Sequence, residues 1–249
     1  MEVYLSHGLG LNSWALYLLL IEQGEIPGET FEAVAVDHGT DWPESYEYLA
    51  MMQGKGYPVT VVRPDSDGCD TVYGFCDKWK MIPSRKPGSR WCTQRFKVAP
   101  LKKHYQTPCI ELIGFDLGEN QRKTGLAGKV GVEQDFPLIN AGIDRGGCES
   151  LIKRHGLPVP IKSGCYICPF QTRRQWIELR EKHPDLFCKA KRLEELTNER
   201  RRAANKLPVY FRDIPLENLI QGKSKGRRQM PGQQEIFEDH GRPPCRCGL

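Results

Sequence analysis

The sequence lacks any apolar stretch long enough to cross a membrane. The longest such stretch, residues 14–21, is far shorter than the roughly 18 residues that a transmembrane helix needs. The first residues show no basic region followed by a small-residue cleavage site, so we expect no signal peptide. The six histidines include no His-x-x-x-His pair, a spacing common in zinc-binding helices. The sequence therefore predicts a cytoplasmic protein with no membrane partner.

The sequence also lacks a strong excess of one charge. Its 36 basic and 31 acidic residues leave a net charge of +5, which permits anionic partners without requiring them. With 39% hydrophobic residues in 249, the chain can bury a sizeable core, and disorder is excluded for most of it. The ten cysteines stand out in such a chain. In a reducing compartment, clustered cysteines indicate metal or redox chemistry rather than a disulfide framework.

Short apolar runs alternate with helix-like stretches over the first 140 residues. The runs are residues 3–5, 31–36, 57–62 and 109–113, and helices are expected at 14–22 and 43–53. This alternation indicates βαβ units and a parallel sheet, whose loops after each strand meet at one ligand-binding edge. Residues 65–105 are expected to be a long functional or disordered loop. Residues 171–205 have a charged helical pattern, and a basic linker is expected from residue 221.

The loop after the first run, residues 6–13, has the sequence Ser-His-Gly-Leu-Gly-Leu-Asn-Ser. Its glycines would let the backbone approach a phosphate, while Ser13 and the first amides of the following helix could donate to phosphate oxygens. The loop has no Lys, so it is not a Walker A motif. A glycine-rich turn in which Asn12 or Ser13 caps the helix is the structural alternative.

Three further motifs follow in order: Val-Asp-His-Gly-Thr-Asp-Trp-Pro-Glu-Ser at 36–45, Arg-Trp-Cys-Thr-Gln-Arg-Phe-Lys at 90–97, and Gly-Phe-Asp-Leu-Gly-Glu-Asn-Gln-Arg at 114–122. From residue 2 to about residue 170, the chain resembles the phosphoadenosine phosphosulfate (PAPS) reductase family of the adenine nucleotide α-hydrolase superfamily, relatives of the PP-loop ATP pyrophosphatases. PP-loop enzymes have Ser-Gly-Gly-x-Asp-Ser in the first loop. Here Asn12 takes the place of the Asp and Leu9 that of a Gly, similar to the Gly-Gly-Gly-x-Asn-Ser variant of family members carried by phages and other mobile elements.

The resemblance implies an α/β fold with a five-stranded parallel sheet, Rossmann-like and typical of adenine nucleotide α-hydrolases. It predicts a nucleotide-binding domain at 1–170 and a helical, basic C-terminal extension at 171–249. An adenine nucleotide would lie over the first loop, with Asp37 and Gly39 near the adenosine. Arg122 would act on the substrate by neutralising phosphate or sulfate, with Lys123 nearby. The predicted nucleotide-binding residues are Ser6, Gly8, Gly10, Asn12, Ser13, Asp37 and Gly39.

Cys165 and Cys168 form a Cys-x-x-Cys pair followed by proline, a spacing that lets two thiolates bind one metal centre. Cys92 is the expected third ligand, because the family places its Arg-Trp-Cys-Thr motif beside the nucleotide. Iron–sulfur adenylyl sulfate reductases have a Cys pair where this chain has Trp91-Cys92. A [4Fe-4S] cluster is therefore predicted, with zinc as the alternative. The fourth ligand is left open between Cys245, Cys247, Cys188 and none, the last leaving an iron free to hold sulfur. Cys69, Cys76, Cys109, Cys148 and Cys188 are otherwise expected to be ordinary buried or helical thiols.

The chain ends in Cys245-Arg246-Cys247-Gly248-Leu249. This tail resembles the Glu-Cys-Gly-Leu-His tail of sulfonucleotide reductases, whose cysteine attacks the sulfur of the substrate; Cys247 would be that nucleophile. The tail could also supply Cys245 to a cluster, or carry thiols without a role.

Three functions are compatible with these features. The first is ATP-dependent sulfur transfer, in which ATP with Mg is attacked at its α-phosphate, and basic residues such as Arg173, Arg174 and those at 200–202 and 223–228 could contact a nucleic-acid substrate. The second is reduction of adenylyl sulfate or PAPS with thioredoxin as reductant. The third is a nucleotide-binding regulatory protein without chemistry. A homo-oligomer is compatible with each of them.

Overall fold

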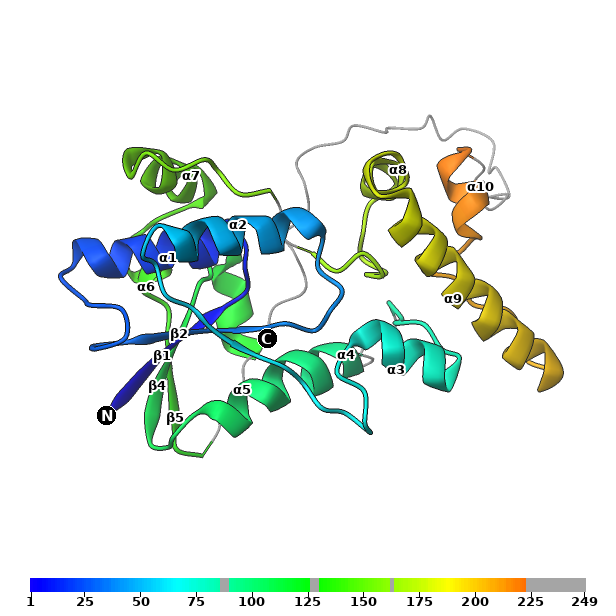
Figure 1. Ribbon diagram of the computed structural model, residues 1–249, viewed down its shortest axis with the longest axis horizontal. Coiled ribbons are helices and arrows are strands. Elements are labelled where there is room, and N and C mark those ends of the chain that lie inside the picture. Colours follow the sequence, from blue (N-terminus) through cyan, green and yellow to red (C-terminus); the bar gives the residue numbers. More distant parts are fainter. Residues whose placement is uncertain (86–89, 126–129, 162–163, 223–249) are drawn as a thin grey trace. The chain divides into compact units, whose positions relative to one another are not determined.

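The computed structural model describes residues 1–85, 90–125, 130–161 and 164–222 (Figure 1). The chain divides into two compact units. The first contains Met1–Val72 and Cys92–Cys165, and the second contains Tyr73–Trp91 together with Tyr166 and the residues after it. The tail with Cys245 and Cys247 lies outside the described residues.

The first unit is built on a five-stranded sheet in which every neighbouring pair is parallel. The strands are β1 (Glu2–His7), β2 (Glu32–Val36), β3 (Thr60–Val62), β4 (Cys109–Ile113) and β5 (Val132–Asp135), in the order β3-β2-β1-β4-β5. The predicted α/β fold with a five-stranded parallel sheet is therefore confirmed. The first four strands coincide with the predicted apolar runs. The fifth strand, β5, was not predicted from the sequence.

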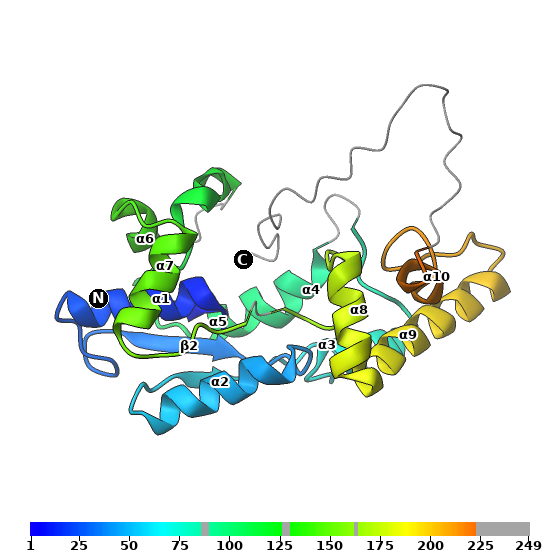
Figure 2. The ribbon, with the colours of Figure 1, turned by 90° about the horizontal axis from the view of Figure 1, so that it is seen from above.

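Helices cover both faces of this sheet (Figures 1 and 2). The helices of this unit are α1 (Leu11–Glu22), α2 (Pro43–Gly54), α4 (Trp91–Thr93, whose first residue falls in the second unit), α5 (Ala99–His104), α6 (Pro137–Asn140) and α7 (Arg145–Arg154). On one face α1, buried from Trp14 to Leu20, packs against β1 and α7 and joins α2 in the main core. On the other face Leu101 of α5 packs with Tyr4 and Val34 of the sheet.

The expected long loop at residues 65–105 is wrong. This segment forms α3 (Val72–Trp79), α4, a π-helical turn (Gln94–Val98) and α5. Its apolar residues are spaced for burial, and Phe75, Phe96 and Leu101 are all inside. The many Gly, Pro and basic residues between these positions hid the helical period from the sequence analysis.

The second unit contains α3 and the charged helices expected over 171–205, which are α8 (Arg173–Lys182) and α9 (Pro184–Ala203), followed by α10 (Leu216–Ile220). A capping box starts α8, because the side chains of Thr172 and Gln175 bond each other's backbone amides. Trp176 of α8 is fully buried against Phe211, with ring centroids 5.3 Å apart. Among the helices in the described ranges, none is long and apolar enough to cross a membrane.

A buried carboxylate on α9 holds the segment that leads to α10. Glu194 is 4% exposed, and its oxygens accept the backbone amides of Phe211 at 2.9 Å and Leu216 at 3.0 Å. Burial raises the pKa of Glu194 to about 7, although the two amide hydrogen bonds favour the ionised form. The side chain therefore changes its charge near neutral pH.

We expect the free energy of unfolding to fall as the pH rises from about 4.5 to about 7, by up to about 3 kcal/mol from Glu194 alone. Between these two pH values, the unfolded chain has released the Glu194 proton and the native protein still holds it. The contribution of Glu194 to stability is therefore complete below about pH 4.5 and is lost as the pH rises to about 7. Urea unfolding followed by tryptophan fluorescence across this range measures the slope. Glu194→Gln should flatten it and the exposed control Glu199→Gln should not; a parent-like slope in Glu194→Gln contradicts the assignment.

Candidate nucleotide-binding site

The predicted phosphate loop lies where the strand order reverses. The strand β1 has β2 on one side and β4 on the other, so the connections from these strands run in opposite directions along the sheet. In open parallel sheets, ligands bind at such a point beyond the carboxyl ends of the strands. The residues at these ends are the loop between β1 and α1 and the segment that follows β4. Both motifs singled out in the sequence therefore meet at one edge.

The loop between β1 and α1 is closed by Ser13. Its hydroxyl oxygen accepts the backbone amide of Gly8 at 3.0 Å, which leaves the hydroxyl proton available to donate to a ligand. Gly10 is the N-cap of α1, with φ −105° and ψ 177°, and the cap has no side-chain hydrogen bond. The alternative in which Asn12 or Ser13 caps the helix is therefore wrong. Because glycine has no side chain to cap them, the first amides of α1 receive no acceptor from the N-cap residue, which suits an anion site.

His7 and Leu9 fix the shape of the loop, and neither was proposed from the sequence as a functional residue. Leu9 has φ +56°, the left-handed region that favours glycine, yet its side chain is only 3% exposed. The amide of Leu9 donates to Nδ1 of His7 at 3.2 Å. Burial lowers the pKa of His7 to about 3, so the ring stays neutral and can accept this hydrogen bond. The His7 ring packs edge-on against Trp14 at 4.3 Å between centroids.

Asn12 connects the loop to the segment after β4. Its amide Nδ2 donates to Asp116 Oδ2 at 3.0 Å and to Glu119 Oε2 at 3.1 Å. Both carboxylates are buried, at 5% and 8% exposure. Asn12 is therefore the donor that allows two acidic side chains to sit beside the loop, which an Asp at this position could not do. Asp116 and Glu119 belong to a motif that the sequence analysis quoted without assigning them a role, because only the fold brings them to Asn12.

Arg122 already has an anionic partner within the chain. Its guanidinium pairs with the Glu119 carboxylate and lies over the Phe115 ring, 4.1 Å from the centroid. An incoming phosphate or sulfate would share or replace the Glu119 contact. The role predicted for Arg122 stays a prediction, and the structure shows which contact has to change.

The loop after β2 contains the other predicted nucleotide-binding residues. Asp37 Oδ1 accepts the Gly39 amide at 3.0 Å and the Tyr46 hydroxyl at 2.9 Å. Gly39 has φ +68°, and a Cβ there would lie 2.3 Å from Thr71 Cγ2. The Asp37–Gly39 turn therefore depends on glycine. Ser6, by contrast, is a buried residue of β1, at 7% exposure, so little of it is accessible to a ligand.

The structure describes three of the four predicted metal ligands. Cys92 and Cys165 belong to the first unit and Cys168 to the second. Burial raises the pKa of the Cys92 thiol, which opposes the thiolate that a metal needs. Within each unit, as far as the structure describes it, no three His, Cys, Asp or Glu side chains gather into a group that could hold a metal ion. The Cys165 and Cys168 sulfurs fit a soft-metal group by donor type and spacing, and the full ligand set stays a prediction.

Thr40 binds the Cys165 side chain. The Cys165 thiol donates to Thr40 Oγ1 at 3.1 Å, and Asp41 and Cys165 form an antiparallel bridge. Thr40 is fully buried and lies 2.7 Å from Nδ1 of His38. His38, Thr40 and Asp41 belong to the sequence motif after β2 and had no predicted role. No local sequence pattern links Thr40 to a cysteine 125 residues away.

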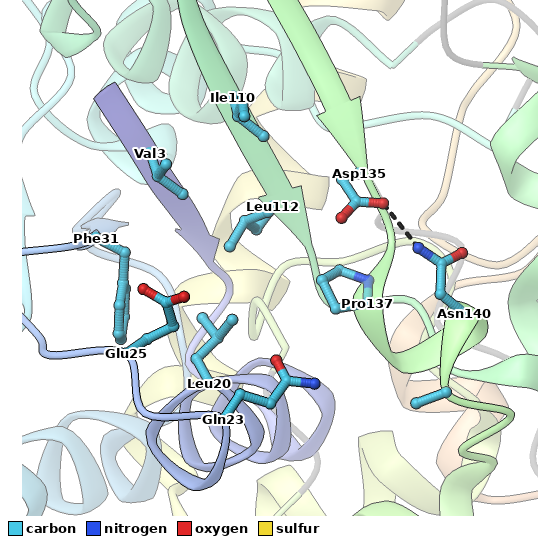
Figure 3. Close-up of a pocket in the computed structure, with 11 residues that line it drawn as sticks. Val3, Leu20, Gln23, Glu25, Phe31, Ile110, Leu112, Asp135, Pro137 and Asn140 are labelled. Carbon is cyan, nitrogen blue, oxygen red and sulfur yellow. Dashed lines mark hydrogen bonds between the residues drawn. The ribbon is translucent and has the colours of Figure 1, made fainter. Parts of the chain in front are cut away.

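One cavity among the described residues is lined by none of the site residues discussed above. It has a volume of about 490 Å³ and lies on the α1 face of the sheet (Figure 3). Leu20, Phe31 and Leu112 line its apolar wall, and Asp135 bonds Asn140 at its rim at 2.8 Å. None of the predicted nucleotide or metal residues lines it.

Three of the basic residues considered for nucleic-acid contact have partners in the second unit, and residues 223–228 lie outside the described residues. Arg173 donates to the carbonyl oxygens of Leu219 and Ile220, while Arg200 donates to that of Trp79. Arg201 similarly bonds the Leu207 carbonyl, so these arginines stabilise the unit itself. Among the other cysteines, Cys69, Cys76, Cys109 and Cys148 are buried as expected, and Cys188 is exposed on α9.

No protein-family model and no curated protein matches this sequence. Solved structures that match include a phosphoadenylyl-sulfate (PAPS) reductase from Candida auris, with 14% identity, a TM-score of 0.47 and coverage of 64% of this chain and 75% of that one. Another is the U34-tRNA thiolase NcsA from Methanococcus maripaludis with its [4Fe-4S] cluster, with 15% identity, a TM-score of 0.45 and coverage of 84% and 74%.

Proposed function

We propose that this chain is an adenine-nucleotide-binding enzyme that cleaves ATP at the α-phosphate and transfers sulfur. The observation that supports this most directly is the placement of the β1–α1 loop at the point where the strand order reverses, with an uncapped helix start and the Ser13 hydroxyl proton beside it. An anion fits this position because helix amides and a hydroxyl would all donate to it. The α-phosphate specificity comes from the family resemblance of the motifs.

In this proposal each motif has a separate task. The loop from Gly8 to Ser13 binds phosphate oxygens, and the Asp37–Gly39 turn holds the adenosine. An acceptor oxygen attacks the α-phosphorus, the bond to pyrophosphate breaks, and AMP becomes joined to the acceptor. A sulfur nucleophile then displaces AMP, so that sulfur replaces the oxygen. A divalent cation such as Mg would balance the phosphate charge beside Asp116 and Glu119.

The metal group proposed for this enzyme is a [4Fe-4S] cluster. Cys165 and Cys168 would hold it together with Cys92, and Cys245 is the proposed fourth ligand. If no fourth cysteine binds, the cluster would instead have one iron free to carry the transferred sulfur.

Nucleotide binding is tested at the loop. We expect Ser13→Ala to weaken ATP binding by roughly 10- to 150-fold, because it removes a donor to a charged phosphate worth about 1.5–3 kcal/mol. Gly10→Val should weaken binding further, since its side chain would stand where the ligand approaches. The Gly10 backbone angles suit valine, so the fold should survive. Titration with ATP measures both, and Ser150→Ala on α7 is the exposed control. Parent-like affinity in both loop variants would show that the phosphate binds elsewhere.

The metal is tested by anaerobic purification. We expect a brown protein whose iron is lost in Cys168→Ser, because thiolate ligation gives iron–sulfur clusters their visible absorption. Cys188→Ser should keep its iron if the exposed Cys188 is not the fourth ligand. Iron, sulfide and zinc are counted on the same samples. A colourless protein that contains one zinc ion would show that these cysteines form a structural zinc site and not a cluster site.

A sulfonucleotide reductase is the second candidate, favoured by the Cys247-Gly248-Leu249 ending. Cys247 would attack the sulfur of adenylyl sulfate or PAPS, and the S–O bond to the nucleotide phosphate would break, releasing the nucleotide. A thioredoxin thiol would then attack the Cys247 sulfur and release sulfite. Sulfite release with thioredoxin, abolished by Cys247→Ser, would establish this function. Pyrophosphate release from ATP, unaffected by Cys247→Ser, would establish sulfur transfer. Nucleotide binding without either product would leave the regulatory alternative.

A further inference from the structure

The Cys165 side chain is the end of a buried chain of polar groups that begins at Asp41. Asp41 Oδ2 lies 3.3 Å from Nε2 of His38, and His38 Nδ1 lies 2.7 Å from Thr40 Oγ1. Thr40 Oγ1 in turn accepts the Cys165 thiol at 3.1 Å. His38, Thr40 and Asp41 are 1%, 0% and 6% exposed, so water does not compete for the contacts among these three, whereas Cys165 is partly exposed. All four residues belong to the first unit.

The backbone holds the two ends of this chain together independently of the side chains. Asp41 and Cys165 form an antiparallel bridge, and the Trp42 amide donates to the Gly164 carbonyl at 3.1 Å. The amide of Val72 donates to the His38 carbonyl at 3.1 Å, which fixes the histidine from the other side. These backbone hydrogen bonds keep the residues that carry the Thr40 and Cys165 side chains close together.

The direction of each hydrogen bond follows from the state of His38. Burial is the largest influence on the pKa of His38 and lowers it, so the ring is neutral at neutral pH and carries a single N–H. The Asp41 carboxylate faces Nε2 and favours the proton on that nitrogen, which makes Nδ1 an acceptor. The Thr40 hydroxyl must then donate to Nδ1. Only its oxygen lone pairs remain for Cys165, so the thiol is the donor.

We propose that Thr40 is a positioning residue for the Cys165 sulfur, and that His38 and Asp41 act through Thr40 by fixing the direction of its hydroxyl. This inference rests on the proposed function only in giving Cys165 a role in the site. It adds that the loop after β2, which carries the proposed adenosine contacts, also determines where this sulfur points. The contact belongs to the metal-free thiol, because a metal would take Cys165 as the thiolate, which has no proton to donate to Thr40.

The test compares Thr40→Val with Thr40→Ser. Valine keeps the shape of threonine and removes the hydroxyl, whereas serine keeps the hydroxyl. The infrared S–H stretching band of Cys165 is identified in the metal-free protein by its loss in Cys165→Ser. We expect the band to move to higher frequency in Thr40→Val and to stay at the parent position in Thr40→Ser. Thr197→Val is the matched control, because Thr197 is buried and its hydroxyl has no hydrogen-bond partner in the structure.

The same variants are reconstituted with iron and sulfide. We expect Thr40→Val to retain iron no less tightly than Thr40→Ser, because the contact that valine removes holds the Cys165 thiol and not a metal-bound thiolate. An unshifted Cys165 band in Thr40→Val overturns the positioning role. Thr40→Ala replaces valine if the latter does not fold, with the same expected shift. Failure of the proposed function has a different signature: the band moves as expected, but the parent binds neither ATP nor iron.

Discussion

Replacing Gly39 with alanine is expected to lower the free energy of unfolding by about 3 to 4 kcal/mol. The left-handed φ of +68° accounts for about 1 to 2 kcal/mol of this loss in a residue with a Cβ. The new Cβ would also lie 2.3 Å from Thr71 Cγ2, and such overpacking costs about 1 to 3 kcal/mol. The strain falls on the turn that Asp37 holds, so ATP binding should weaken together with stability.

Urea unfolding and ATP titration on the same preparations measure both effects. The control is Gly54→Ala at the end of α2, where a Cβ would meet no atom within 4 Å and φ is not positive. That substitution should be neutral or stabilising by up to about 1 kcal/mol. Adding Thr71→Ala to Gly39→Ala should recover only part of the overpacking loss, because the Cβ of residue 71 would still lie 2.9 Å from the new Cβ, and it should recover none of the backbone part. Equal stabilities of Gly39→Ala and Gly54→Ala would contradict the described turn.

Asn12→Asp is expected to destabilise the protein by about 4 kcal/mol at neutral pH. The change removes two hydrogen bonds from an amide to carboxylates, each worth about 1.5 to 3 kcal/mol, and places a third carboxylate against Asp116 and Glu119. The substitution restores the residue that PP-loop enzymes have at this position, yet here the neighbouring acids oppose it. The introduced carboxyl should keep its proton to a higher pH than a free aspartate, so the loss should shrink as the pH falls.

Chemical unfolding at several pH values measures this prediction. Asn140→Asp is the matched control, because Asn140 also donates to one carboxylate, Asp135, but at an exposed site. Its effect should stay below about 1 kcal/mol. Combining Asn12→Asp with Glu119→Gln should recover part of the stability, since it removes one of the two opposing charges. Full stability of Asn12→Asp at neutral pH would mean that the loop and the segment after β4 do not meet as described.

The buried strands were predictable because strands of a parallel sheet are covered on both faces and have continuous apolar runs, as in Cys109–Ile113. The edge strand β5 has the sequence Val-Glu-Gln-Asp and is only partly buried, so it has no such run. The helices within 65–105 were missed for the related reason that their turns are short and separated by glycine, proline and basic residues.

The same distinction applies to the residues of the candidate site. Those close together in the sequence could be predicted, and those brought together by the fold could not. The loop between β1 and α1 could be proposed as a phosphate site because its glycines and Ser13 are close together in the chain and follow a strand. The contact of Asn12 with Glu119 joins residues 107 positions apart, and that of Thr40 with Cys165 joins residues 125 apart. No spacing rule links such pairs, so the acidic neighbours of the loop and the histidine behind the cysteine became visible only through the fold.

Leu9 gives the phosphate loop an unusual thermodynamic character. A glycine in its place would leave the loop free to sample many backbone conformations, and a ligand would have to reduce them to one. The buried Leu9 side chain and the His7 ring hold the backbone in one conformation before any ligand arrives. The entropy of ordering the loop is therefore lost when the protein folds and not when the nucleotide binds. We expect a correspondingly small entropic penalty for binding, which calorimetry on the parent and on Leu9→Gly would separate from the enthalpy of the phosphate contacts.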